Sequence, residues 1–407
     1  MRILIVADVY PPEVSSAANL MRELAVGLMK LGNDVTVVTS YPKYYLDAES
    51  EEKTFPEYTT EDGVSVIRVH VLPHHRVNFF VRGIAQLLLP FLFLRKVNQY
   101  MRVGVDAVVV YSPPLPLALL GGMIQRRYGA KFLLNMQDIF PQNAIDLHIL
   151  TLPPLIWFFE QIEKRVYREA DVITFHSEGG ARFLMDKKQV PPSKIVTVPN
   201  WVDIEAHKSV LLSHEWREKW GLEKKFIFLF AGVFGPAQGL ELLVNVAYEL
   251  RDNPHVAFLL VGGGNEKEKL EQIVSMRGIT NVIIKPFVPQ RDYASLVAEC
   301  DVGVVCLSAQ NKTPFVPGKL SGYMASGKPV IALLNKESDG FEVIHTAQCG
   351  YAIEAKDASD AAPLFKKMYA ERDTLSTLGE NGLRYARTHF SREVCVKTIE
   401  TLLRKEK

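Results

Sequence analysis

A lysine that directly follows a glycine, at the start of an expected helix, is the feature of this sequence best suited to chemistry. Lys319 follows Gly318, and apolar residues recur after it at helical spacing until Gly327. A helix that begins at a glycine presents free backbone N–H groups and the positive end of its dipole. Together with the ammonium, such an N-terminus can hold a diphosphate. An ordinary helix with a surface lysine fits the same stretch, and the stretch alone leaves both interpretations open.

Two glycine-rich loops precede this helix, and each follows an apolar run typical of a buried strand. The first spans 232–239 and the second spans 262–264. Glycine lets the backbone approach a ligand closely, and both loops lead into expected helices. Because the carboxyl ends of parallel strands meet at one edge of a sheet, these loops and Lys319 together predict a nucleotide-diphosphate site. The chain lacks G-x-x-x-x-G-K-[ST], which excludes a P-loop NTPase.

The first half of the chain carries candidate substrate-binding residues, most of them in loops that follow expected strands. The set that we predict is Ser15, Ser16, Asp138, Gln142 and Asn200. Asp138 could orient or deprotonate a hydroxyl, or it could be a turn or cap residue, and both roles stay open. The loop after the first strand contains no G-x-G-x-x-G, so a nicotinamide or flavin dinucleotide is not indicated.

Strands and helices must alternate along the chain to position these loops. One series begins with an apolar strand at 3–7, and a second begins with an apolar strand at 226–231. This pattern predicts the α/β class, with two Rossmann-like doubly wound domains facing each other across a cleft. We expect a first domain over 1–205, a second over 206–388 and a final helix within 389–407.

Length, charge and cysteine content narrow the class of protein. A chain of 407 residues is too long for one compact core. Its net charge of +1 argues against a nucleic-acid-binding protein. The four cysteines form no CxxC pair, which fits buried thiols in a reducing cytoplasm better than disulfides or a metal site. The first apolar run ends at Asp8, too early for a signal peptide.

A basic, apolar stretch without acidic residues follows an acidic one. Residues 47–62 are acidic and predict a mobile surface loop, whereas 63–105 contains no Asp or Glu. The apolar run within it, 87–94, is too short to span a membrane and contains Pro90. We therefore expect a basic, aromatic-rich helix pair over 76–102 that lies on an anionic membrane surface. A buried apolar helix with cationic ends is the alternative.

Several motifs, taken jointly, resemble those of a known family. They are PNWVD at 199–203, FAGVFGPAQGLELL at 230–243, LLVGGGNEKEKL at 259–270, PFVP at 286–289 and GKLSGYMASGKPVIAL at 318–333. Their order and spacing resemble the GT-B glycosyltransferases of family four. YPPE at 10–13 and QDIFPQ at 137–142 are similar to its bacterial polysaccharide enzymes of the fucosamine-transferase and colanic-acid type.

The resemblance implies a retaining transfer from a nucleotide-diphosphate sugar, usually UDP-linked, without an obligatory metal. The donor sugar would be a hexose or an N-acetylated amino sugar, and the acceptor a lipid-linked or growing polysaccharide, as in lipopolysaccharide or O-antigen synthesis. The enzyme would work in the cytoplasm at the inner face of the membrane. Residues 1–205 would hold the acceptor, 206–388 the nucleotide sugar, and the final helix would cross back to the first domain.

The same resemblance assigns roles to single residues. Lys319 and Asp138 would be catalytic. The donor would contact Gly232, Gly235, Gln238, Gly262, Gly264, Phe287, Val288, Gly318, Lys319, Ser321 and Gly322.

This chain departs from the family pattern at positions that matter. Gly322 and Pro314 stand where many members have a pair of glutamates, and Val233 and Gln238 replace the usual arginine and lysine of the first glycine loop. Lys319 would therefore have the main phosphate role. Gln142 stands where the subgroup often has a glutamate.

Two other functions fit the motifs. A GT-B nucleotide-sugar epimerase would have no use for the basic apolar stretch and would stay in solution when liposomes are pelleted. A non-catalytic nucleotide-sugar binder would explain the missing carboxylates. Release of UDP in the presence of a lipid-linked acceptor would exclude this second alternative.

Overall fold

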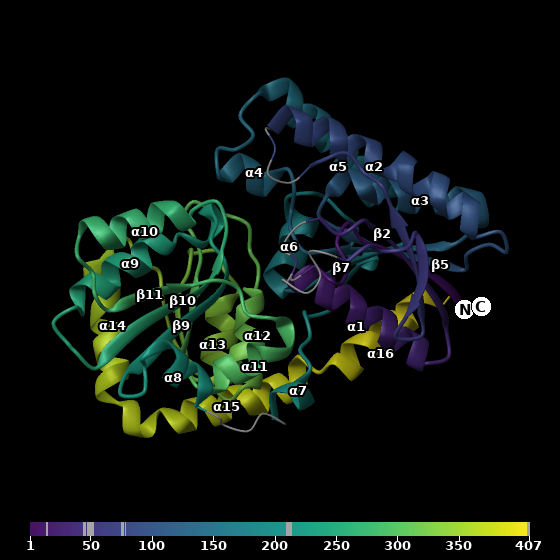
Figure 1. Ribbon diagram of the computed structural model, residues 1–407. Helices are drawn as coiled ribbons and strands as arrows, with labels where there is room; N and C mark the ends of the chain where they lie inside the picture. The colour runs from purple at the N-terminus through teal and green to yellow at the C-terminus, as the bar shows by residue number, and fades with distance from the viewer. Residues whose placement is uncertain are drawn as a thin grey trace. The chain divides into compact units, whose positions relative to one another are not determined.

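The chain divides into two compact units, each an α/β sandwich around a largely parallel sheet. A computed structural model describes residues 1–13, 15–43, 46, 53–74, 77, 79–208 and 214–404. Unit 1 comprises Met1–Pro199 and Arg392–Lys407, and unit 2 comprises Asn200–Ser391 (Figure 1). The divisions lie a few residues from the expected 205/206 and 388/389. Two such Rossmann-like units confirm the predicted fold class.

The sheet of unit 1 has the strand order β3-β4-β2-β1-β5-β6-β7-β8, and only β3 is antiparallel to its neighbour. Its strands are β1 (Arg2–Val6), β2 (Asp34–Ser40), β3 (Tyr58–Glu61), β4 (Val64–Val69), β5 (Ala107–Ser112), β6 (Lys131–Met136), β7 (Val172–Phe175) and β8 (Ile195–Thr197). Its helices are α1 (Ser16–Lys30), α2 (Phe79–Tyr100), η1 (Leu115–Ala118), α3 (Leu119–Tyr128), α4 (Gln142–Asp146), α5 (Pro153–Glu169), α6 (Glu178–Asp186), η2 (Pro192–Lys194) and α16 (Arg392–Leu403).

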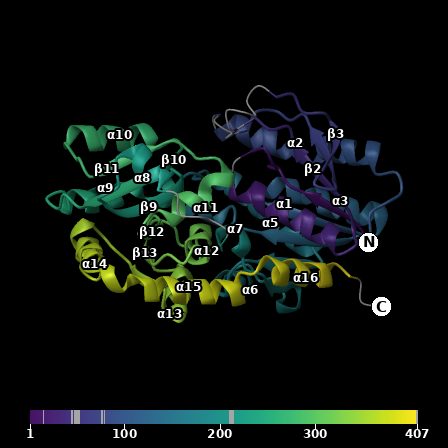
Figure 2. The same ribbon diagram turned by 60° about the horizontal axis from the view of Figure 1, so that its bottom comes forward.

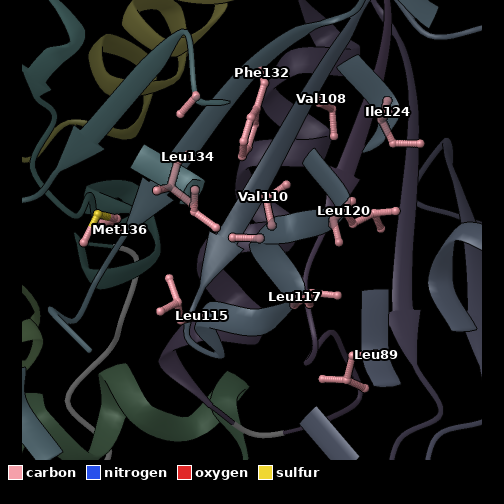
Figure 3. Close-up of a cluster of buried hydrophobic side chains, with 14 of the residues drawn as sticks. Leu89, Val108, Val110, Leu115, Leu117, Leu120, Ile124, Phe132, Leu134 and Met136 are labelled. Carbon is pink, nitrogen blue, oxygen red and sulfur yellow. The ribbon is translucent and has the colours of Figure 1, made fainter. Parts of the chain in front are cut away.

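Helices cover both faces of this sheet. Helices α1 and α16 lie side by side on one face, so the last helix completes the unit that the first strand begins (Figures 1 and 2). Helices α2, α3 and α5 cover the other face. Their apolar side chains join those of β5 and β6 in one buried cluster, which includes Leu89 of α2, Leu120 of α3 and Phe132 of β6 (Figure 3).

Two local predictions in unit 1 were wrong. Part of the expected mobile loop is strand β3, because Tyr58–Glu61 pairs with β4; residues 47–52 lie outside the described part. Helix α1 begins directly at Ser16, because the Ser15 side chain accepts a hydrogen bond from the Ala18 N–H (3.1 Å) and caps the helix.

The expected helix pair is one helix, α2, which continues through Pro90. Leu89, Phe93 and Val97 are fully buried in the unit 1 core, and this packing outweighs the backbone hydrogen bond that proline cannot make. None of the described helices has both the length and the apolar character needed to cross a bilayer.

The sheet of unit 2 is fully parallel, in the order β11-β10-β9-β12-β13-β14. Its strands are β9 (Phe226–Val233), β10 (Val256–Gly263), β11 (Val282–Lys285), β12 (Val302–Cys306), β13 (Val330–Leu333) and β14 (Gly350–Ile353). Its helices are α7 (Ile204–Lys208), α8 (Glu215–Trp220), η3 (Pro236–Gln238), α9 (Leu240–Glu249), α10 (Lys267–Met276), α11 (Gln290–Ala298), α12 (Gly318–Ala325), α13 (Gly340–Ala347), α14 (Ala358–Ala370), η4 (Arg372–Thr374) and α15 (Leu375–His389).

The two faces of this sheet have separate cores. Side chains of α9, α10 and α14 pack on one face, and side chains of α11, α12, α13 and α15 pack on the other. All four cysteines are free and buried, as expected. Among the described residues, no group of three or more His, Cys, Asp and Glu side chains is arranged to hold a metal ion.

The opposite faces of α2 should respond differently to truncation. Phe93→Ala removes a fully buried ring and should lower the free energy of unfolding by about 3–5 kcal/mol. Phe91→Ala, on the exposed face of the same helix, should change it by less than about 0.5 kcal/mol. Urea denaturation followed by circular dichroism measures both values, and equal losses would contradict this assignment of faces.

Candidate functional site

The carboxyl edge of the unit 2 sheet brings together most of the predicted donor-binding residues. Neighbouring strands β11, β10, β9 and β12 end in a row at this edge. Phe287 follows β11, the glycine loops follow β10 and β9, and the loop after β12 leads to Lys319 at the start of α12. The Phe287 ring lies beside Gly263 at the end of β10, and the Lys319 side chain lies beside Gly232 at the end of β9. The edge therefore holds an aromatic ring and an ammonium at two neighbouring strand ends.

The two glycine loops pack directly on each other. Phe234 N–H donates to the Gly263 carbonyl (2.8 Å), and Glu266 N–H donates to the Phe234 carbonyl (3.1 Å). A Cβ on Gly262 would lie 1.9 Å from the Gly232 carbonyl oxygen, and one on Gly264 would lie 2.3 Å from that of Phe234. Contact between the loops thus requires glycine at 262 and 264, whether or not a ligand binds there.

Gln238 holds the first glycine loop closed. Its side-chain oxygen accepts a hydrogen bond from the Gly235 N–H at 3.2 Å. The Gly235 N–H therefore already has a partner within the loop, although the resemblance implied that Gly235 contacts the nucleotide sugar. The sequence alone did not predict this hydrogen bond, because a glutamine three residues after a glycine does not indicate that the two residues are bonded.

Lys319 lies against the first glycine loop without a carboxylate partner in the described part of the chain. Its Nζ is 4.7 Å from the centroid of the Phe230 ring. A Cβ on Gly232, where φ is +145°, would lie 2.5 Å from Lys319 Cε. The residue is half-buried as a whole, and burial lowers the pKa of its ammonium to about 8. The site therefore holds an uncompensated cation, which favours an anionic ligand.

Tyr323 fixes the helix that carries Lys319 onto strand β9. Its hydroxyl donates to the Leu229 carbonyl and accepts from the Ala231 N–H, both at 3.1 Å. Strand β12 pairs with β9 at only two positions, the second being Gly303 with Leu229. The Tyr323 ring packs on Gly303, where an added Cβ would lie 2.3 Å from the ring. Beyond the point where β12 stops pairing with β9, the Tyr323 hydroxyl makes the hydrogen bonds to β9.

The remaining donor-site residues differ in how they face the edge. Ser321 is buried, and its hydroxyl donates to the Gly318 carbonyl of its own helix (3.0 Å). Gly322 faces the Tyr293 hydroxyl, which would lie 3.3 Å from an added Cβ. Phe287 lies beside Gly263, and Val288 packs into the core. Phe287 and Gly318 are thus better placed for a ligand than Ser321.

In unit 1, Asp138 and Gln142 share the region after β6, whereas Ser15 and Ser16 start α1 after β1. The Asp138 side chain as a whole is exposed. Partial removal of its carboxyl from water by the surrounding protein raises the pKa of that carboxyl above its ordinary value. The Gln142 side chain donates to Asp146 Oδ1 (2.9 Å). Asn200 is the first residue of unit 2.

A buried ionic cluster at the carboxyl edge of unit 1 was not predicted. His74 Nε2 lies 2.7 Å from Asp8 Oδ2, and the Ser40 hydroxyl donates to Asp8 Oδ1 at 2.7 Å. Burial alone would lower the pKa of His74, but the hydrogen bond and charge of Asp8 raise it above its ordinary value. The cluster ties the segment after β4 to the end of β1. A lone histidine after a strand gives no sequence signal for such a pair.

Two family models together span most of the chain. Residues 17–201 match the glycosyl transferase 4-like domain, and residues 213–385 match the glycosyl transferases group 1. The chain belongs to the GT-B glycosyltransferases. This agrees with the parallel sheets and the carboxyl-edge site, and it confirms the family resemblance at that level.

Relatives and solved structures agree with this assignment. The chain is 25% identical to the probable glycosyltransferase WbjE of Pseudomonas aeruginosa, over 73% of this chain and 74% of that protein. It is 25% identical to the putative colanic acid biosynthesis glycosyl transferase WcaI of Escherichia coli, over 80% and 82%. In fold it is similar to sucrose-phosphate synthase of Thermosynechococcus elongatus (TM-score 0.78, 17% identity, 98% of both chains) and to Anabaena HepE in complex with UDP and glucose (0.74, 16%, 99% of both).

Removal of the Tyr323 hydroxyl should loosen the first glycine loop. Tyr323→Phe leaves the buried Ala231 N–H without its partner, so the free energy of unfolding should fall by about 1–3 kcal/mol. Amide hydrogen exchange should accelerate at 231–235 before the rest of β9. Exchange at these amides unchanged from the wild type would contradict the anchoring role. Tyr248→Phe, on a ring that contacts Arg251 and Arg277, is the control.

Proposed function

We propose that this glycosyltransferase moves a sugar, with retention, from a UDP-sugar to a lipid-linked or growing polysaccharide acceptor. The observation that carries the proposal is the Lys319 ammonium, which lies beside Gly232 at the carboxyl edge with no carboxylate partner in the described chain. The negative charge of a bound diphosphate would balance the positive charge of this ammonium. The nucleoside would lie toward Phe287 and Val288, across the ends of β10 and β9.

The chemistry follows from where charge develops. As the bond between the anomeric carbon and the diphosphate oxygen breaks, negative charge grows on that oxygen. Lys319 and the N–H groups at the start of α12 stabilise this charge. The acceptor hydroxyl attacks from the same face of the sugar and loses its proton to the departing phosphate oxygen. Asp138 would position that hydroxyl from the acceptor side. No step in this scheme requires a metal ion.

The names of similar proteins support the choice of substrates. WcaI is named for colanic acid biosynthesis, and HepE has been solved with UDP-glucose. An N-acetylated amino sugar as donor is our proposal from the fucosamine-transferase resemblance. We also propose that residues 1–205 hold the acceptor and that 206–388 hold the donor.

The surface of helix α2 supports our proposal that the enzyme binds peripherally to the inner face of the cytoplasmic membrane. Its outward face exposes a stripe of large apolar side chains, with arginines on the same helix. These residues are Val81, Arg82, Ile84, Leu88, Phe91 and Arg95. Two cations of the predicted basic stretch do not contribute, because Arg68 is buried with Glu61 (2.7 Å) and Lys96 pairs with Glu57 (2.6 Å). Arg76 lies outside the described residues.

Truncation of the lysine tests the proposed site. Lys319→Ala should lower turnover of the UDP-sugar by about a hundredfold or more, as expected for one lost charge-stabilising donor. Lys312→Ala, at an exposed position shortly before α12, should leave the rate within twofold of the wild type. Release of UDP measures both rates. A normal rate in Lys319→Ala would reject the assignment.

The lowered pKa of Lys319 predicts a pH dependence. The ammonium is charged below pH 8 and loses its proton as pH rises through about 8, so the Kd for UDP should rise by up to about tenfold per pH unit above that value. In Lys319→Arg the guanidinium stays charged, so its Kd should stay constant from pH 7 to 9.5. Calorimetric titration at several pH values measures this, and parallel profiles would contradict it.

A further inference from the structure

A second apolar surface in unit 1 lies at the start of α5. Four large apolar side chains from the loop before α5 and its first two turns are more than a third exposed. They are Ile149, Leu152, Trp157 and Phe158, and Trp157 is 63% exposed. Leu150 and Phe159, next to them in sequence, are buried in the unit 1 core. The segment is therefore well packed, and the exposed side chains are an outward face rather than loose structure.

The outward face of α5 changes from aromatic to basic along the helix. Trp157, Gln161, Lys164 and Arg168 recur at i, i+4, i+7 and i+11, so they share one stripe, and all four are exposed. Neither Lys164 nor Arg168 has a carboxylate partner in the described part of the chain. The stripe thus offers an apolar end and two uncompensated cations.

The acidic side chains of α5 are all buried or half-buried. Glu163 is buried and pairs with Lys188 (3.0 Å), and Glu169 pairs with Arg126 (2.7 Å). Glu160 is half-buried. From 147 to 159 the sequence contains no Asp or Glu at all. The surface is therefore complementary to a partner that is apolar inside and anionic at its boundary.

Helices α5 and α2 belong to the same layer of unit 1. Both contact α3 and contribute to the cluster on one face of the sheet (Figure 1). Their exposed faces, with Trp157 on one helix and Ile84 and Phe91 on the other, therefore both look away from that sheet. The two exposed faces thus lie on the same side of the sheet.

We infer that the start of α5 is a second membrane contact, in which Trp157 and Phe158 enter the boundary between headgroups and acyl chains of an anionic bilayer. Lys164 and Arg168 lie over the phosphates at the same surface. This extends the contact proposed for α2, but it concerns neither the donor nor the chemistry. An indole at the headgroup boundary, followed by cations on the same helical stripe, is the arrangement that a bilayer favours.

The fluorescence of Trp157 tests the inference directly, because the other three tryptophans are less exposed. Trp201 and Trp216 are buried, and Trp220 is half-buried. Full-length protein is mixed with vesicles of phosphatidylcholine and phosphatidylglycerol whose acyl chains carry bromine. We expect a blue shift and quenching of the emission. Trp157→Phe, which keeps an apolar ring, should still pellet with the vesicles but lose most of the quenching.

Two pairs of substitutions distinguish the apolar from the electrostatic contribution to vesicle binding. Trp157→Ala with Phe158→Ala should weaken vesicle binding by at least about tenfold. Lys164→Gln with Arg168→Gln should weaken it for anionic vesicles and leave binding to pure phosphatidylcholine unchanged. Met276→Ala, which removes a side chain 78% exposed on unit 2, should change neither.

Vesicle-bound protein whose Trp157 stays unquenched would overturn the inference and leave α2 as the membrane contact. Failure of the wild type to bind any vesicle, or equal binding by the double alanine variant, would also overturn it; the face would then suit a protein partner. UDP release with a detergent-solubilised acceptor reports separately on the proposed transferase activity, so failures of the two proposals can be distinguished.

Discussion

The hydroxyl of Tyr323 makes the contact on which the geometry of the candidate site depends. It hydrogen-bonds to two backbone groups of β9 just before the first glycine loop, where β12 no longer pairs with that strand. Lys319 lies one helical turn earlier on α12. One buried side chain therefore sets the position of both the ammonium and the loop. Such preorganisation limits the reorganisation that ligand binding would otherwise require.

The glycines and the lysine act together at this edge. Gly262 and Gly264 let the loops touch, and Gly232 makes room for the aliphatic part of Lys319. The ammonium then rests over Phe230, partly removed from water, which destabilises its charged form and lowers its pKa. The folded protein thus holds a partly desolvated positive charge, which a bound anion would stabilise. A single cation of this kind is what our proposal of a phosphate ligand depends on.

The repeated βα pattern and the apolar strands made the fold class and the carboxyl-edge position of Lys319 predictable from the sequence. Side-chain partners were not predictable. The hydrogen bond from Gly235 N–H to Gln238 and the pairing of Arg68 with Glu61 depend on loop paths that no periodicity encodes. Likewise, Pro90 signals a helix break locally, but the core packing of Leu89 and Phe93 outweighs it. Local signals therefore predicted which residues gather at this sheet edge, but not the interactions among them.

The course of the chain through unit 1 has a consequence for biosynthesis. Val396 of α16 fills the space that Gly27 leaves on α1, where an added Cβ would lie 2.8 Å from the valine. Helix α16 follows α1 in the chain only after the strands of both sheets. The side of α1 that meets α16 therefore stays uncovered until the strands and helices between them have been made, and during that time it is open to chaperones and to aggregation. Closure of this layer thus depends on a segment that the ribosome makes after both sheets.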